Sequence, residues 1–207
     1  MIVNAVVAAT RQAAGTQAQL RAGQDSDLIV STFQAQYAEA VRLGKVFSVA
    51  NQTGIATTVG LATTYTGLAV SNPLGSGVNL VLLKVAAAFP VAVAAGVVVG
   101  VMVGYNAGTN VTHTAAIAPR SNLVGTGAAG LALADTSCTF PTAPTLQKVI
   151  GTIGTAAITA MSIEPAISED FEGSIILPPG AYAAFYTSTV SGALGFVGSF
   201  KWMEIAV

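Results

Sequence analysis

The pattern after residue 44 is one of short apolar runs separated by turn residues. Runs of Val, Ile, Thr, Tyr and Phe alternate with Gly, Pro and Asn at intervals of about ten to fifteen residues. No strongly amphipathic helix interrupts them. We expect an all-β chain, a β-sandwich or jelly roll. The strands are predicted at residues 45–50, 63–71, 79–89, 93–104, 146–163 with a break near Gly154, 173–177, 181–189 and 194–205, and loops at 115–134 and 139–145.

The first 43 residues differ from the rest, because Ala, Gln, Thr and Arg dominate and large apolar residues are few. A segment with so little to bury does not fold alone. We therefore expect residues 1–43 to form an N-terminal arm that lies across a neighbouring subunit, and residues 44–207 to form the sandwich domain. Two elements are predicted near the end of the arm: a short strand at 28–30, and a short helix over 33–43, where Phe33, Tyr37 and Val41 are spaced by four and Gly44 follows.

Charge is scarce along the whole chain. Its 207 residues include 8 Lys+Arg, 9 Asp+Glu, one His and one Cys, so that 8% are charged and 53% hydrophobic. Ordinary soluble domains carry about 25% charged residues. Such a chain either lies in lipid or covers much of its surface with other protein, and it offers few groups for enzyme chemistry. Its net charge of −1 and scattered basic residues give no surface for nucleic acid.

One apolar segment has the length of a membrane span. Residues 85–104 carry no charge, and Gly96, Gly100 and Gly104 have the spacing that lets membrane helices approach closely. However, the strongly apolar residues are mostly Val, which favours strands, and Pro90 would kink a helix. We expect two buried strands, with the glycines at places of close packing or bulging. The alternative is a small membrane protein that spans at 85–104.

Candidate catalytic residues are few. A Ser-His-Asp site would have to use His113, the only histidine, and no GxSxG motif is present. We expect His113 to be a hydrogen-bonded loop residue. Cys138 is the only cysteine, so it forms no disulfide within the chain, and we expect it to be a small buried hydrophobe. No catalytic residue and no cofactor-binding residue is predicted.

The only acidic cluster is Ser168-Glu-Asp-Phe-Glu-Gly173. Several carboxylates beside a glycine can hold Ca²⁺, but the spacing does not match an EF-hand loop. We expect a solvated turn here, and therefore no metal ion and no cofactor.

Several segments resemble virion structural proteins of tailed bacteriophages. They are Leu28–Ser31, Tyr37, Gly44–Phe47, Thr66–Pro73, Gly75–Gly77, Ile175–Tyr182 and Gly198–Trp202. The resemblance implies a β-sandwich subunit, in particular a homotrimeric cement or decoration protein that binds the major capsid protein on the phage head surface. It implies no catalytic residues.

The resemblance and the composition together predict a non-enzymatic virion protein. A cement protein buries surface against its own copies and against the shell, which accounts for the low charge. The arm and exposed loops such as 106–130 are the predicted bridging elements. Alternatives are a phage tail, adaptor or receptor-binding component, and the membrane protein described above. A carbohydrate-binding or glycan-cleaving sandwich is a further alternative, although Trp202, the only tryptophan, is expected in the core.

Overall fold

The computed structural model describes residues 36–154 and 167–207, apart from residues 92, 94 and 128. The chain divides into two units, Met1–Glu39 and Ala40–Val207. The strand predicted at 28–30 and the part of the 146–163 run beyond residue 154 lie outside the described residues.

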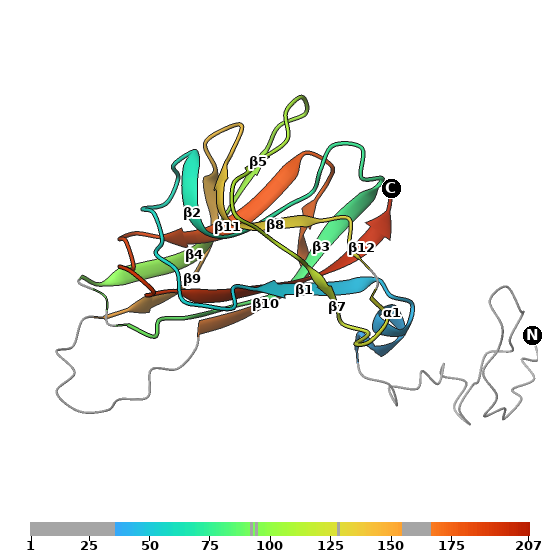
Figure 1. Ribbon diagram of the computed structural model, residues 1–207, viewed down its shortest axis with the longest axis horizontal. Helices are drawn as coiled ribbons and strands as arrows, with labels where there is room; N and C mark the ends of the chain where they lie inside the picture. The colour runs from blue at the N-terminus through green and yellow to red at the C-terminus, as the bar shows by residue number, and fades with distance from the viewer. Residues whose placement is uncertain (1–35, 92, 94, 128, 155–166) are drawn as a thin grey trace, which may run out of the picture. The chain divides into compact units, whose positions relative to one another are not determined.

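Two antiparallel sheets make up the second unit and pack face to face, so the predicted β-sandwich is confirmed (Figure 1). The first sheet has the order β10 (Ile167–Leu177), β3 (Val78–Ala88), β12 (Val197–Ala206), β1 (Val46–Ala50) and β7 (Arg120–Ser121). The second has the order β5 (Thr112–His113), β8 (Leu133–Thr139), β2 (Thr64–Ser71), β11 (Ala181–Thr187), β4 (Val97–Tyr105) and β9 (Thr145–Ile153), and β6 (Ala116–Ile117) also pairs with β8.

The helix predicted over 33–43 is a single short turn, α1 (Ala38–Arg42). Gly44 ends it with a φ of +68°, and its amide donates to the Val41 carbonyl. The next amide, of Lys45, donates to the Ala40 carbonyl. Glycine is favoured after a helix because it adopts this left-handed conformation without a Cβ clash.

The main core lies between the two sheets and is rich in aromatic residues. Phe185 of β11 contacts Phe196 edge-on, with ring centroids 5.1 Å apart, and Phe200 of β12 at 4.8 Å. Trp202 is fully buried, as predicted. Aliphatic residues from both sheets fill the space around these rings, among them Leu68, Val70, Leu80, Leu82, Val97, Val99 and Val101.

A second, smaller core covers the other face of the second sheet. Side chains alternate along a strand, so Met102 lies on the opposite face from Val101 and joins a separate cluster with Tyr65, Cys138 and Tyr182. The ring of Tyr182 stacks on Phe140 with centroids 4.4 Å apart. Cys138 is buried, as predicted. Because part of the second sheet is buried on both faces, the chain needs more apolar residues than an ordinary sandwich.

The apolar segment at 85–104 contributes to β3 and β4, and Pro90 lies between them. Among the described residues no helix is long and apolar enough to span a membrane. Close packing is confirmed at two of the three glycines: a Cβ on Gly104 would lie 2.2 Å from the Tyr182 ring, and one on Gly100 would lie 2.5 Å from the Lys148 carbonyl. Gly96 has room for a side chain.

Two expectations about loops are wrong. The loop predicted at 115–134 contains β6 and β7 and the first residues of β8, a strand that hydrogen-bonds on both sides. The sequence of β8 is Leu-Ala-Asp-Thr-Ser-Cys-Thr. It shows no apolar run, because a charged residue, Asp135, occupies one of the buried positions of the strand. The acidic cluster at 168–173 belongs to β10 and not to a turn, and a bulge lies between Asp170 and Ile175.

Candidate functional site

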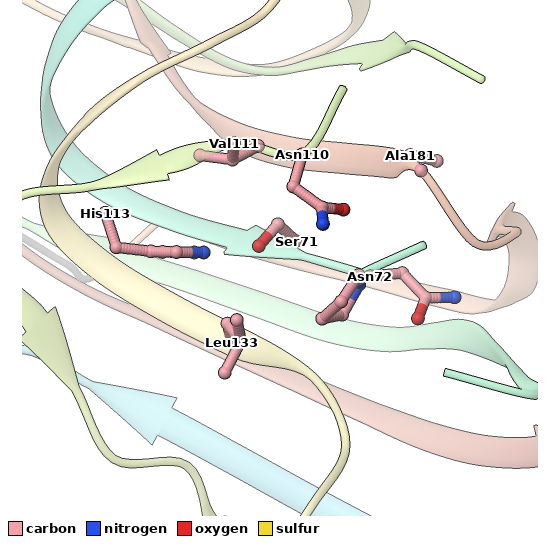
Figure 2. Close-up of a pocket in the computed structure, with 9 residues that line it drawn as sticks. Ser71, Asn72, Asn110, Val111, His113, Leu133 and Ala181 are labelled. Carbon is pink, nitrogen blue, oxygen red and sulfur yellow. The ribbon is translucent and has the colours of Figure 1, made fainter. Parts of the chain in front are cut away.

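The small cavity beside His113 is the place where polar groups converge. It has a volume of about 130 Å³ and lies where β2, β5, β8 and the start of β11 meet (Figure 2). Its lining consists of Ser71, Asn72, Pro73, Asn110, Val111, His113, Leu133, Gly180 and Ala181.

His113 is held by a buried carboxylate. Its Nδ1 forms a hydrogen bond with Oδ2 of Asp135, which is only 1% exposed on β8. Burial raises the pKa of Asp135, and the hydrogen bond and charge of His113 offset this only in part. The pair joins β5 to the adjacent strand β8, where His113 lies opposite Cys138. The prediction that His113 is hydrogen-bonded is therefore confirmed, although the residue lies in a two-residue strand.

Ser71, at the end of β2, faces His113 across the cavity. Figure 2 shows the Ser71 hydroxyl and the His113 ring pointing toward one another. The hydroxyl is buried and has no hydrogen-bond partner among the described residues, so no bond joins it to His113. An activated serine needs such a bond to its base. The arrangement thus contains the three residue types of a hydrolytic triad without the contact that activates the nucleophile.

The buried surroundings of Asp135 also determine the protonation state of Cys138, the only cysteine. Burial, together with the charge of Asp135, raises the pKa of Cys138 to about 12. The thiol is therefore protonated at neutral pH, and thiols react as thiolates. Cys138 acts as an apolar core residue here.

The acidic cluster forms two ion pairs. Asp170 contacts Lys84 at 3.0 Å, and Glu169 pairs with Lys148 of β9. Within residues 36–154 and 167–207, no group of three or more His, Cys, Asp or Glu side chains is arranged to hold a metal ion. The carboxylates of Glu169 and Asp170 link β10 to its neighbours.

An exposed edge of the sandwich is the second candidate site. β9 and β10 are each the last strand of their sheet, and the pair of Lys148 and Glu169 joins them. No other strand in the described part of the chain pairs with the outer side of β9. Large apolar side chains are exposed along this edge: Tyr105 is 56% exposed, Val149 53% and Ile176 54%.

A cleft of about 450 Å³ lies between the two edge strands. Residues of β9 and β10 and the end of β4 line it, among them Tyr105, Gln147, Ile176 and Pro178. Sequence reasoning misses this surface, because the apolar residues at 146–153 have the same pattern as those of a buried strand. We call the outer side of β9, with Leu146 and Val149, the β9 edge.

Comparison with known proteins gives no match: no family model, no curated protein and no solved structure is similar to this chain.

Proposed function

We propose that the chain is a non-enzymatic structural protein of a tailed-phage virion, and specifically a homotrimeric cement or decoration protein that bridges major capsid subunits on the head surface. The observation that supports this most strongly is the exposed apolar edge formed by β9 and β10. The domain already has a complete core between its sheets and a second one on an outer face. Apolar side chains left outside such cores are available to contact other subunits.

Exposed apolar residues also occur at loops that could reach a partner. Val124, in the loop between β7 and β8, is 92% exposed, and this loop lies within the predicted bridging segment 106–130. Leu194, between β11 and β12, is exposed as well. Side chains of this kind form the apolar centre of a protein interface when a partner covers them.

The low charge of the chain supports an assembled state. A free β-sandwich usually keeps its edges from pairing with other chains by means of charged side chains. Lys148 is the only charged residue of β9, and it is engaged within the chain: it pairs with Glu169, and its Nζ lies 5.5 Å from the ring centre of Phe171. A closed oligomer covers such an edge with protein.

The pocket beside His113 supports the non-enzymatic part of the proposal. Its serine lacks a bond to the histidine, the neighbouring cysteine is protonated, and its volume admits only a few water molecules.

A phage tail, adaptor or receptor-binding component would use the same kind of surface, and copy number separates the two. Quantitative mass spectrometry of purified particles of a phage that encodes this chain should give on the order of hundreds of copies per head, in proportion to the major capsid protein. Cryo-electron microscopy should place them as trimers on the shell. A few copies per particle would favour the tail component, and absence from purified particles would contradict a virion role.

A further inference from the structure

We infer that the β9 edge is an acceptor for the N-terminal arm of a second copy of this chain, which adds a strand along residues 145–153. The inference rests on the self-assembly in the proposed function, and on no property of the capsid. The contact between the arm and the β9 edge is the one by which one subunit holds the next.

The β9 edge has the features of an acceptor strand. β9 is nine residues long, and among the described strands it pairs only with β4. On its other side no strand in the described part of the chain takes up the backbone N–H and C=O groups, and an edge of this kind is what β-augmentation uses. Leu146 pairs with Met102 and Val149 with Gly100, so both project from the outer face of the sheet. An added strand can therefore gain apolar contacts as well as backbone hydrogen bonds.

The usual protection of an open edge is absent from β9. A lysine that points outward from an edge strand discourages pairing. Lys148 instead points toward β10, where Glu169 neutralises it. β9 contains no proline that would remove a backbone donor.

The arm supplies a suitable donor segment. Residues 28–33, Leu-Ile-Val-Ser-Thr-Phe, form an uncharged run of strand-forming residues within the 35 residues that precede the described part of the chain. At about 3.3 Å per residue, six residues span roughly 20 Å, which covers most of the nine-residue edge.

The strand that follows the arm in the sequence, β1, and the acceptor strand, β9, belong to different sheets. The arm leads into β1, which lies three strands away from the edge strand β10 in the first sheet, and β10 lies beside β9. When one part of a subunit donates and a different part accepts, the contact is head-to-tail. Head-to-tail contacts close into a ring where the rotation between subunits permits it and otherwise continue into an open filament, so this pairing is compatible with the proposed cyclic trimer.

Site-specific photo-cross-linking in the full chain tests the pairing. Val149 is replaced by p-benzoylphenylalanine, and the protein is refolded as a mixture of equal amounts of ¹⁵N-labelled and unlabelled chains. After irradiation and trypsin digestion, residue 149 should be joined to the fragment of residues 22–42, which ends at Arg42. Half of the cross-linked products should contain one labelled and one unlabelled chain. The matched control carries the same photoreactive residue at Val190, which is similarly exposed at 49% but lies after β11, and it should not capture this fragment.

Other products overturn the inference. Cross-links within one chain only would show that the arm covers its own β9. Capture of residues 155–166, or of β9 from a second copy, would assign the edge to a different occupant. Capture of no fragment from an oligomeric protein would also refute the arm contact, while leaving self-assembly intact.

Two substitutions provide a second readout. Val149→Lys places a charge on the acceptor, and Ile29→Pro removes a backbone donor from the arm. Each should convert the oligomer to monomer in light scattering while the β spectrum stays the same, and Val190→Lys should not. Oligomers of unchanged mass in both variants would refute the inference. A monomeric unmodified protein would instead contradict the proposed self-assembly itself.

Discussion

Trp202 and Glu204, two residues apart on β12, share a buried hydrogen bond: the indole Nε1 donates to Glu204 Oε1 over 3.3 Å. The same carboxylate oxygen accepts from the backbone amides of Leu131 at 2.8 Å and Ala132 at 3.1 Å. These two residues lead into β8, so Glu204 joins one sheet to the other. Its side chain is buried.

Replacing this carboxylate with an apolar group should destabilise the domain. Glu204→Leu leaves three donors without an acceptor, of which the Ala132 amide and the Trp202 indole are buried, and each buried unsatisfied group costs about 1–3 kcal/mol. We expect a loss of at least about 2 kcal/mol in the free energy of unfolding, measured by urea denaturation followed by tryptophan fluorescence. Glu204→Gln keeps an acceptor oxygen and should lose clearly less. Equal losses in the two variants would show that the charge, and not the hydrogen bonds, is what matters.

Gly104 and Gly96 form a matched pair for testing the second core. A Cβ at Gly104 would overlap the Tyr182 ring, which stacks on Phe140 and donates a hydrogen bond to the Thr142 carbonyl. Gly104→Ala should therefore cost about 1–3 kcal/mol, or roughly 2–12 °C in Tm. A Cβ at Gly96 would lie 3.7 Å from its nearest neighbour, an ordinary contact distance, so Gly96→Ala should leave Tm nearly unchanged. Similar Tm values for the two variants would contradict the packing described.

The glycines also show what the sequence can predict. The spacing of Gly96, Gly100 and Gly104 resembles a membrane-helix motif, yet the abundance of Val around them favours strands, and strands are present. Local composition therefore correctly predicts strands and not a membrane helix. The same reasoning cannot tell that Gly100 and Gly104 are packed tightly while Gly96 is not, because that depends on Tyr182 and Lys148, which are distant in sequence.

Asp135 should make the stability of the domain depend on pH. Because burial raises its pKa, the folded chain binds this proton more tightly than the unfolded chain does. The contribution to stability is complete below the ordinary carboxyl value of 3.8 and is lost as the pH rises through the raised pKa. Relative to Asp135→Asn, the free energy of unfolding of the unmodified protein should therefore decrease as the pH rises above 3.8, until the folded chain has also lost this proton. A difference that is constant or increases with pH would refute the effect of burial.

Asp135 also explains why the sequence pattern does not reveal strand β8. A carboxylate normally marks the solvent side of a strand or a turn, and here it is buried beside His113. Its partner lies 22 residues away in the sequence, so no local pattern reveals the pair. The acidic residues of β10 mislead in the same way. Their charge suggests a solvated turn, but in the strand Glu169 and Asp170 pair with lysines that lie on other strands.

Cys138 should report on global unfolding. With its pKa raised to about 12 and its side chain buried, the thiol should not react with a thiol reagent in the native protein at neutral pH. Labelling should begin only in urea concentrations at which the tryptophan fluorescence also changes. Because the chain has a single cysteine, mass spectrometry gives the modified fraction directly. Rapid and complete labelling without denaturant would contradict the burial of Cys138.

If this chain is a self-assembled structural subunit, as we propose, its mass in solution should show it most directly. Size-exclusion chromatography with light scattering, in buffer without detergent and with far-UV circular dichroism on the same peak, gives both mass and secondary structure. We predict a closed oligomer, a trimer of 20.7 kDa chains, with a β spectrum. A stable monomer at all concentrations, or protein that dissolves only in detergent with a helical spectrum, would contradict the claim.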